Sequence, residues 1–383
     1  MKGDAEEPYV ENPAKATGND RFDACPNRND WYETVKLNYG VDYCNGHICH
    51  FDPIPDTWNK MRDILLFWAS KGIDGFRCDM AEMVPVEFWG WVIPQIKAAY
   101  PDLVFIAEVY NPNEYRNYIF KGQFDYLYDK VGLYDTVRNV TCGYASASDI
   151  TNCWKSLEGI TGHMLNFMEN HDEQRLASDF FAGSGRKGRP GMIVSTCMNT
   201  NPVMIYFGQE FGERGMQSEG FSGRDGRTTI FDYWNVDTIA RWRNKDKFDG
   251  KLHGEGRKRN FNHFYTRLLN LCKQEKSIYD GQFFDLMYVN YENWNFNQHK
   301  QYAFLRKKDN EVLLIVVNFD EIPAHIGINI PAHALEFLGI PPREHQQVID
   351  LLTGKAERID FLPDHAVQTD VEGFNGKILK FTF

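Results

Sequence analysis

The sequence predicts an α/β domain built on a parallel sheet, followed by an antiparallel β-sandwich at its C-terminal end. The first observation is the order strand, helix, strand between residues 72 and 107, which defines a βαβ unit and therefore a parallel sheet. The second is a change after about residue 285, where short strands are separated by Pro, Gly and Asp turns. We expect an irregular segment over residues 1–50, an α/β domain over 51–285 and the β-sandwich over 286–383.

The βαβ unit carries the clearest pattern. A helix that begins with a cap at Asp56 ends at Gly72, and the strand Gly72–Met80 follows it. Pro85 begins a second helix, and the continuous apolar run Leu103–Ala107 is typical of a strand that is buried on both faces. Both helices place apolar residues at helical spacing, so each is expected to cover the sheet.

The alternation of strands and helices continues beyond this unit. The expected strands are Phe124–Tyr128, Met164–Met168 and Pro202–Phe207, and the expected helical regions are 133–157, 190–198 and a helix that includes Phe261–Cys272. In the C-terminal part, Glu311–Phe319 is expected as a buried strand, and Ile326, Ile328 and Ile330 alternate as in a strand with one buried face.

The composition argues against two classes of partner. A formal net charge of -11 disfavours nucleic acid and anionic membrane surfaces, and no apolar run approaches the roughly 20 residues of a membrane-spanning helix. Aromatic residues make up 15% of the chain. Rings that stack on sugar faces, together with carboxylates that accept hydrogen bonds from hydroxyls, are the side chains of a saccharide site. We therefore expect an oligosaccharide or polysaccharide partner, with no nucleic acid and no membrane.

The segment Cys44–His50 contains four side chains that can bind zinc, namely Cys44, His47, Cys49 and His50. Their spacing matches no common zinc pattern, and adjacent ligands rarely reach one tetrahedral centre. We expect ordinary loop packing here and no metal site.

The first candidate site residues lie in Arg77-Cys78-Asp79, at the end of an expected strand. Residues two apart in a strand share a face, so Arg77 and Asp79 point to one side and Cys78 is buried on the other. A neighbouring arginine lowers the pKa of a carboxyl group and keeps it ionised, as a carboxylate nucleophile requires. A structural ion pair at a strand end explains this stretch equally well.

Acidic residues also follow two later strands. Glu108 comes directly after Leu103–Ala107, and His171 and Asp172 come shortly after Met164–Met168. Catalytic groups of parallel α/β proteins lie at the carboxyl ends of the strands. Carboxylates that gather at one rim repel each other unless a ligand or a mechanism uses them, so these positions are candidate site residues.

Two carboxylates are the minimum for glycoside hydrolysis. Asp79 beside Arg77 suits an ionised nucleophile. Glu108 suits a general acid, because desolvation at the end of an apolar strand raises the pKa of a carboxyl group. His171 and Asp172 can contact sugar hydroxyls and stabilise an oxocarbenium-like transition state.

Three motifs, in this order along the chain, resemble a known family. They are GFRCD (75–79), FIAEV (105–109) and FMENHDEQ (167–174), and they are similar to the fourth, fifth and seventh barrel-strand motifs of the alpha-amylase family of glycoside hydrolases. The run PVMIYFGQEFG (202–212) resembles the eighth strand of that family. The resemblance implies a (β/α)8 TIM barrel with a C-terminal β-domain and a retaining double displacement.

The resemblance also implies a role for each candidate residue. Asp79 would be the nucleophile, Glu108 the general acid/base and Asp172 the stabiliser of the transition state. Arg77 would orient Asp79, and His171 would bind the sugar where cleavage occurs.

The chain departs from the family pattern at its beginning. The first family motif, D-x-x-x-N-H after the third strand, has no counterpart, and residues 31–43 resemble the end of the domain inserted after that strand. We therefore expect an incomplete barrel of strands 4–8 with residues 1–50 as a remnant of the insertion, closed by a missing N-terminal segment or by self-association. The chemistry needs no cofactor, and a structural calcium is left open because its usual ligands are largely absent.

The resulting prediction is a retaining alpha-glycosidase that cleaves starch-like glucans or maltooligosaccharides. Two alternatives stay open, a relative that transfers the glycosyl unit to a sugar and a non-catalytic sugar-binding or structural homologue. Non-catalytic relatives usually lose a catalytic carboxylate, whereas Asp79, Glu108 and Asp172 are all present.

Overall fold

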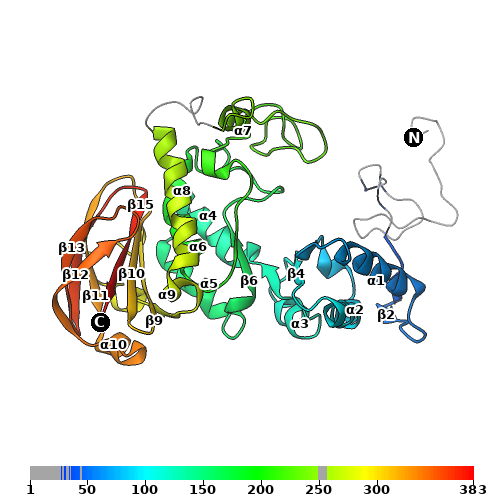
Figure 1. Cartoon of the computed structure of the whole chain (residues 1–383), viewed down its shortest axis with the longest axis horizontal. Coiled ribbons are helices and arrows are strands. Elements are labelled where there is room, and N and C mark those ends of the chain that lie inside the picture. The colour runs from blue at the N-terminus through cyan, green and yellow to red at the C-terminus, as the bar shows by residue number, and fades with distance from the viewer. Residues whose placement is uncertain (1–26, 28–29, 32–33, 35, 44, 249–256) are drawn as a thin grey trace. The chain divides into compact units, whose positions relative to one another are not determined.

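The computed structural model describes residues 27, 30–31, 34, 36–43, 45–248 and 257–383, apart from the side chains of 257–260. The chain divides into two compact units, Met1–Leu127 and Tyr128–Phe383, and each is described by itself (Figure 1). The expected boundaries after residues 50 and 285 stay predictions, and most of the segment 1–43 lies outside the described residues.

The first unit is a βαβ arrangement, as the sequence predicts. Its strands are β1 (Val41–Asp42), β2 (Ile48–Cys49), β3 (Gly75–Cys78) and β4 (Val104–Ala107), and its helices are α1 (Asp56–Ala69), α2 (Val86–Ala99) and α3 (Tyr115–Phe120). Strand β5 (Tyr126–Tyr128) ends one residue beyond the boundary of this unit. Strands β3, β4 and β5 are parallel neighbours in that order, with Gly75 opposite Val104 and Ile106 opposite Tyr126. The short pair β1 and β2 is antiparallel.

Two local predictions in this unit are wrong. The helix α1 has Pro55 as its N-cap without a side-chain hydrogen bond, and Asp56 instead forms an ion pair with Lys60, with 2.6 Å between Oδ2 and Nζ. Strand β4 is fully buried on one face only, because Phe105 and Ala107 are buried whereas Val104 and Ile106 are half-buried. The half-buried face is the one that carries the polar groups described below.

The second unit begins with the remaining parallel strands and their helices. Its first elements are α4 (Asp135–Cys142), α5 (Ile150–Ser156), β6 (Met164–Phe167), α6 (Arg189–Cys197), β7 (Val203–Met204), α7 (Asp237–Arg243), α8 (Arg257–Gln274) and α9 (Lys276–Tyr279). Strands β6 and β7 are parallel. The expected helical region 133–157 is two helices, because Gly143 ends α4 with φ near 80°.

The C-terminal part of this unit is antiparallel, as predicted. Its elements are β8 (Gln282–Asp285), β9 (Gln301–Lys308), β10 (Glu311–Asn318), β11 (Ala324–Ile330), α10 (Ala332–Leu338), β12 (Arg343–Asp350), β13 (Ala356–Phe361), β14 (His365–Val371) and β15 (Asn375–Thr382). Six strands form one sheet in the order β13-β12-β15-β10-β9-β8, and β11 pairs with β14. The predicted alternation in β11 is confirmed, since Ile326, Ile328 and Ile330 are all buried.

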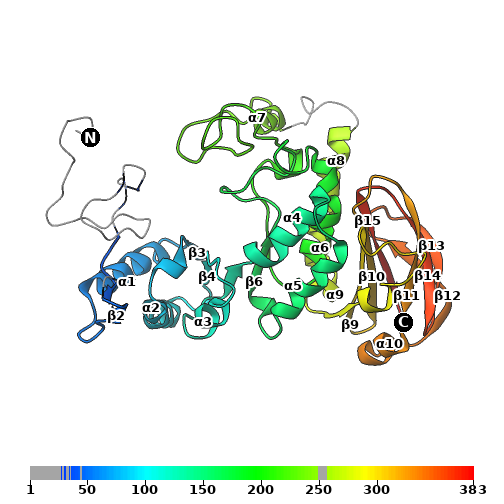
Figure 2. The same ribbon diagram turned by 180° about the vertical axis from the view of Figure 1, so that it is seen from behind.

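Helix α6 connects the two parts of the second unit. It contacts α8, β6, β10 and β15, and Figures 1 and 2 show α6 and α8 side by side next to the C-terminal sheet. All nine of its residues except Arg189 are buried, which explains why its sequence is almost wholly apolar or small. No helix among the described residues is long and apolar enough to cross a membrane.

Candidate functional site

Arg77, Asp79 and Glu108 come together at the carboxyl ends of β3 and β4. The register pairs Arg77 with Ile106 and Cys78 with Ala107, so Asp79 and Glu108 are the next residues of two adjacent parallel strands. The backbone N–H of Glu108 donates to the carbonyl of Cys78 at 3.1 Å, which continues the pairing. Since alternate residues share a face, all three charged side chains leave the sheet on the same side.

Arg77 contacts both carboxylates. Its Nη1 donates to Oδ1 of Asp79, and its Nη2 lies 2.9 Å from Oε2 of Glu108. The two acids differ in their surroundings, because the side chain of Asp79 is 75% exposed whereas that of Glu108 is 3% exposed. The arginine therefore links one solvent-facing and one buried carboxylate.

Glu108 is buried as predicted, but the expected apolar environment is wrong. Besides Arg77, its Oε2 accepts from the backbone N–H of Met80 at 2.8 Å, and its Oε1 accepts from the hydroxyl of Tyr110 at 2.5 Å. Met80 has a left-handed backbone with φ near 41°, a conformation that non-glycine residues seldom adopt and that is concentrated at functional sites. The side chain of Glu108 is thus held at both oxygens.

Tyr110 is a residue of this group that the sequence interpretation missed. It lies two residues after Glu108, so the alternation that places Arg77 and Asp79 on one side could also have suggested Tyr110. The structure confirms the predicted burial of Cys78. Its thiol is buried on the opposite face, and burial raises its pKa to about 12.

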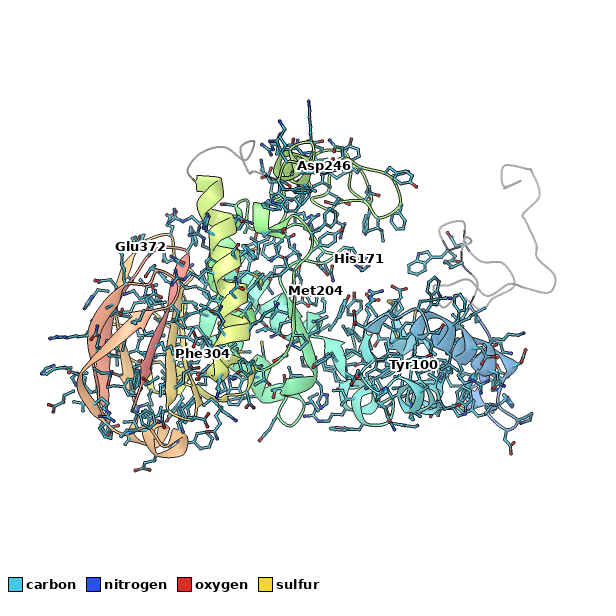
Figure 3. The ribbon with its side chains drawn as sticks, viewed as in Figure 1. Tyr100, His171, Met204, Asp246, Phe304 and Glu372 are labelled. Carbon is cyan, nitrogen blue, oxygen red and sulfur yellow. The ribbon has the colours of Figure 1, made fainter. Side chains whose placement is uncertain are left out.

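His171 and Asp172 lie together in the second unit, in the turn that follows β6. Figure 3 labels His171, together with Met204 of the neighbouring strand β7. The Nε2 of His171 is 3.1 Å from Oδ2 of Asp172. The side chain of Asn170 fixes this turn, because its Oδ1 accepts from the backbone N–H groups of Asp172 at 2.9 Å and Glu173 at 2.8 Å.

A buried ion pair lies at the base of this turn. Glu169 and Arg175 are both fully buried, with 3.0 Å between Oε2 and Nη1. Burial raises the pKa of Glu169 to about 7, and the charge of Arg175 opposes that rise. Sequence reasoning missed this pair, since no pattern connects two charged residues at a separation of six.

The structure therefore arranges the five predicted residues as two groups, one in each unit. Arg77, Asp79 and Glu108 form the first, and His171 and Asp172 form the second. Within the described part of the chain, no three His, Cys, Asp or Glu side chains come together in a way that could hold a metal ion. Of the four zinc-capable side chains in Cys44–His50, Cys44 lies outside the described residues, and Cys49 is an exposed free thiol.

Comparison with known sequences identifies the family. The family model described as the catalytic domain of alpha-amylase matches residues 54–251, which is more than half of the chain. A short stretch is 39% identical over 57 residues to an alpha-1,4-glucan:maltose-1-phosphate maltosyltransferase of Cereibacter sphaeroides, and it covers 15% of this chain and 10% of that enzyme. Alpha-amylase 2 of Dictyoglomus thermophilum is 23% identical over 269 residues, which cover 69% of this chain and 42% of that protein.

Comparison with solved structures supports the same fold. A noncanonic maltogenic alpha-amylase from Thermotoga neapolitana is 17% identical and has a TM-score of 0.60, and the match covers 90% of this chain and 72% of that one. The alpha-amylase from H.orenii is 18% identical with a TM-score of 0.63, covering 91% and 67% of the two chains. This chain therefore belongs to the alpha-amylase family of glycoside hydrolases.

Proposed function

We propose that this protein cleaves α-glucosidic bonds of starch-like glucans or maltooligosaccharides with retention of configuration. The observation that carries the proposal is the contact of one arginine with two carboxylates, Asp79 and Glu108, on the same side of adjacent strands. A retaining glycosidase needs one carboxylate to attack the sugar and a second one nearby to move a proton. Membership in a family of enzymes that act on α-glucans supports this assignment.

In the proposed reaction Asp79 is the nucleophile. Its exposed carboxylate attacks the anomeric carbon while the glycosidic bond breaks and Glu108 gives a proton to the leaving oxygen. Water then attacks the covalent glycosyl ester, Glu108 takes a proton from that water, and the carboxylate of Asp79 leaves. Because the chain's own carboxylates carry out both steps, the chemistry requires no cofactor.

His171 and Asp172 are proposed to bind the sugar whose bond is broken. Hydrogen bonds to its hydroxyls, together with the negative charge of Asp172, would stabilise the positive charge that develops on the ring. Arg77 would hold Asp79 in the orientation for attack, and Met80 and Tyr110 would do the same for Glu108.

The direct test is Asp79→Asn. We expect this nearly isosteric change to abolish cleavage of maltooligosaccharides, followed by chromatography of the products, with an unchanged circular dichroism spectrum because the side chain is exposed. Asp63→Asn is the matched control, since Asp63 is an exposed aspartate paired with Arg62 in the same unit. Near-normal activity of Asp79→Asn, or products of inverted configuration by NMR, would contradict the mechanism.

Transfer to a sugar acceptor is the second candidate function, and the match to maltosyltransferases favours it. Both outcomes use the same glycosyl ester, which is resolved by water in one case and by a sugar hydroxyl in the other. Incubation with a single maltooligosaccharide separates them, because transfer produces chains longer than the substrate and hydrolysis produces only shorter ones.

We further propose that additional strands pair with the parallel strands of each unit. In the described residues β3 pairs only with β4, and β7 pairs only with β6, which leaves an open strand edge in each unit. A longer form of the chain or a second copy would supply the missing pairing. Light scattering on the purified chain tests this proposal, and an active monomer of 383 residues would contradict it.

A further inference from the structure

The turn that holds His171 and Asp172 is fastened by a segment far away in the sequence. The bridging segment, Gly226–Thr228, makes three hydrogen bonds, one to Asp172 in the turn and two to Arg175 just beyond it. The carbonyl of Gly226 accepts from the backbone N–H of Arg175 at 2.7 Å, and Nε of Arg227 donates to the carbonyl of Asp172 at 2.6 Å. The hydroxyl of Thr228 accepts from Nε of Arg175 at 3.0 Å.

Arg175 connects the bridging segment to the residues that follow β6 and β7. Its Nη1 contacts Glu169, which follows β6, and also donates to the carbonyl of Phe207, beyond β7, at 2.8 Å. Its guanidinium carbon lies 4.0 Å from the centre of the Tyr206 ring. A planar guanidinium can satisfy several acceptors in fixed directions at once, whereas the single ammonium group of lysine cannot reproduce that geometry.

Arg227 is held from the other side by its own loop. Its backbone N–H donates to Oδ1 of Asp225 and its Nη1 to Oδ2 of the same carboxylate, both at 3.1 Å. Its guanidinium carbon also lies 5.2 Å from the centre of the Phe221 ring. These contacts orient Nε before it reaches the carbonyl of Asp172, so little side-chain freedom is lost in making that bond.

We propose that Arg175 and Arg227 are positioning residues that fix the main chain of the turn Asn170–Asp172 and thereby the carboxylate of Asp172. Neither residue needs to touch the substrate, because both act through the backbone of the turn. Every contact in the argument lies within the second unit. The consequence for catalysis rests on the proposed function, whereas the consequence for the mobility of the turn does not.

Hydrogen exchange of the whole chain gives a readout independent of activity. The backbone N–H groups of Asp172 and Glu173 donate to Asn170 within the turn, so loosening of the turn exposes them. We expect Arg227→Lys to accelerate their exchange about tenfold or more. Arg224→Lys is the matched control, because Arg224 lies three residues before Arg227 and its Nη2 lies 3.8 Å from Oδ2 of Asp179 at an exposed position.

Thr228 offers a second pair of variants with little effect on shape. Thr228→Val removes the acceptor for Nε of Arg175 and should accelerate the same exchange, whereas Thr228→Ser keeps the hydroxyl and should not. This pair decides the question even where Arg227→Lys fails to fold.

The kinetic readout follows if the chain cleaves maltooligosaccharides. Arg227→Lys and Thr228→Val should lower kcat about tenfold and change KM less than about twofold, because they misplace a group that acts in the transition state. Unchanged exchange of Asp172 and Glu173 in both variants would overturn the positioning role. An inactive wild type with accelerated exchange in the variants would instead overturn the proposed function and leave the positioning role in place.

Discussion

The two groups of candidate residues are built by different means. In the first unit, Arg77, Asp79 and Glu108 are brought together by two adjacent parallel strands whose register places them at one level. In the second, the carbonyl of Asp172 accepts a hydrogen bond from Arg227, which lies 55 residues away along the chain. Alternation and strand register produce the first arrangement, whereas the second combines the local hydrogen bonds of Asn170 with a long-range one from Arg227.

The two arginines at the centre of these groups also differ in exposure. The side chain of Arg77 is 27% exposed, whereas that of Arg175 is 0% exposed. Breaking an ion pair that water can reach costs the folded protein little stability, because water solvates the remaining charge. Breaking a fully buried pair costs much more, because it leaves an uncompensated charge in the interior. We infer that the first group serves the chemistry of the reaction and the second keeps the turn rigid, and four experiments test this difference.

The largest effect is expected from Glu108→Gln in the first group. Loss of the proton-transferring carboxyl should lower kcat on maltooligosaccharides by about 10²- to 10⁴-fold, in the range of general acid–base catalysis. The amide oxygen can still accept from the backbone N–H of Met80, and the amide NH2 group can donate to the hydroxyl oxygen of Tyr110, so the thermal midpoint should stay close to that of the wild type. Glu87→Gln, which removes a partly exposed pair with Lys121, is the control, and an equal loss in that variant would sink the assignment.

A comparison of Arg175→Met with Arg77→Met tests the difference in burial. Arg175→Met should cost about 3–5 kcal/mol of unfolding free energy, because it leaves Glu169 buried with a single backbone donor from Leu176. Arg77→Met should cost less, since Asp79 is solvated and Glu108 keeps two donors. Urea denaturation measures both variants, and equal losses would show that burial does not separate the two groups.

The pH dependence of stability provides a third test. The pKa of Glu169 is about 7 in the folded chain, above its ordinary value of 4.5, because burial disfavours the charged form. The folded state therefore holds this proton more tightly, and its contribution to stability is present below pH 4.5 and is lost as the pH rises through 7.

Glu169→Gln has no proton to lose at this position. We expect the unfolding free energy of the wild type to drop as the pH rises from 5 to 8. In the variant this drop should be smaller by about 2–3 kcal/mol. Urea titrations across this range measure the difference. Parallel curves for the two proteins would mean that Glu169 does not titrate there.

The smallest effect is expected from Gly75→Ala in β3. A Cβ at this position would lie 2.3 Å from the carbonyl oxygen of Val104, its partner on β4, so the strands would have to separate. We expect a loss of about 1–3 kcal/mol in thermal or urea denaturation, together with reduced activity. Gly162→Ala is the control, because its Cβ would meet no atom closer than 3.9 Å. An equal loss of stability in the control would show that the close approach of β3 and β4 is not the cause.

The sequence predicted the parts of the molecule that local rules decide. The βαβ order and the shared side of Arg77 and Asp79 follow from periodicity, and the structure confirms both. The environment of Glu108 could not be predicted, because an apolar strand says nothing about the donors of the following loop. The bridge from Arg227 to Asp172 was equally hidden, since sequence periodicity carries no information about contacts at such a distance.

The buried thiols give the molecule internal reporters of opening. Alkylating reagents react with the thiolate, and burial both shields Cys78 and raises its pKa to about 12. Cys197, on α6, is likewise buried with a raised pKa. Cys78 lies in the first unit and Cys197 in the second, so the order in which reagents label these two thiols would show which unit opens first, whereas exposed Cys49 should react at once.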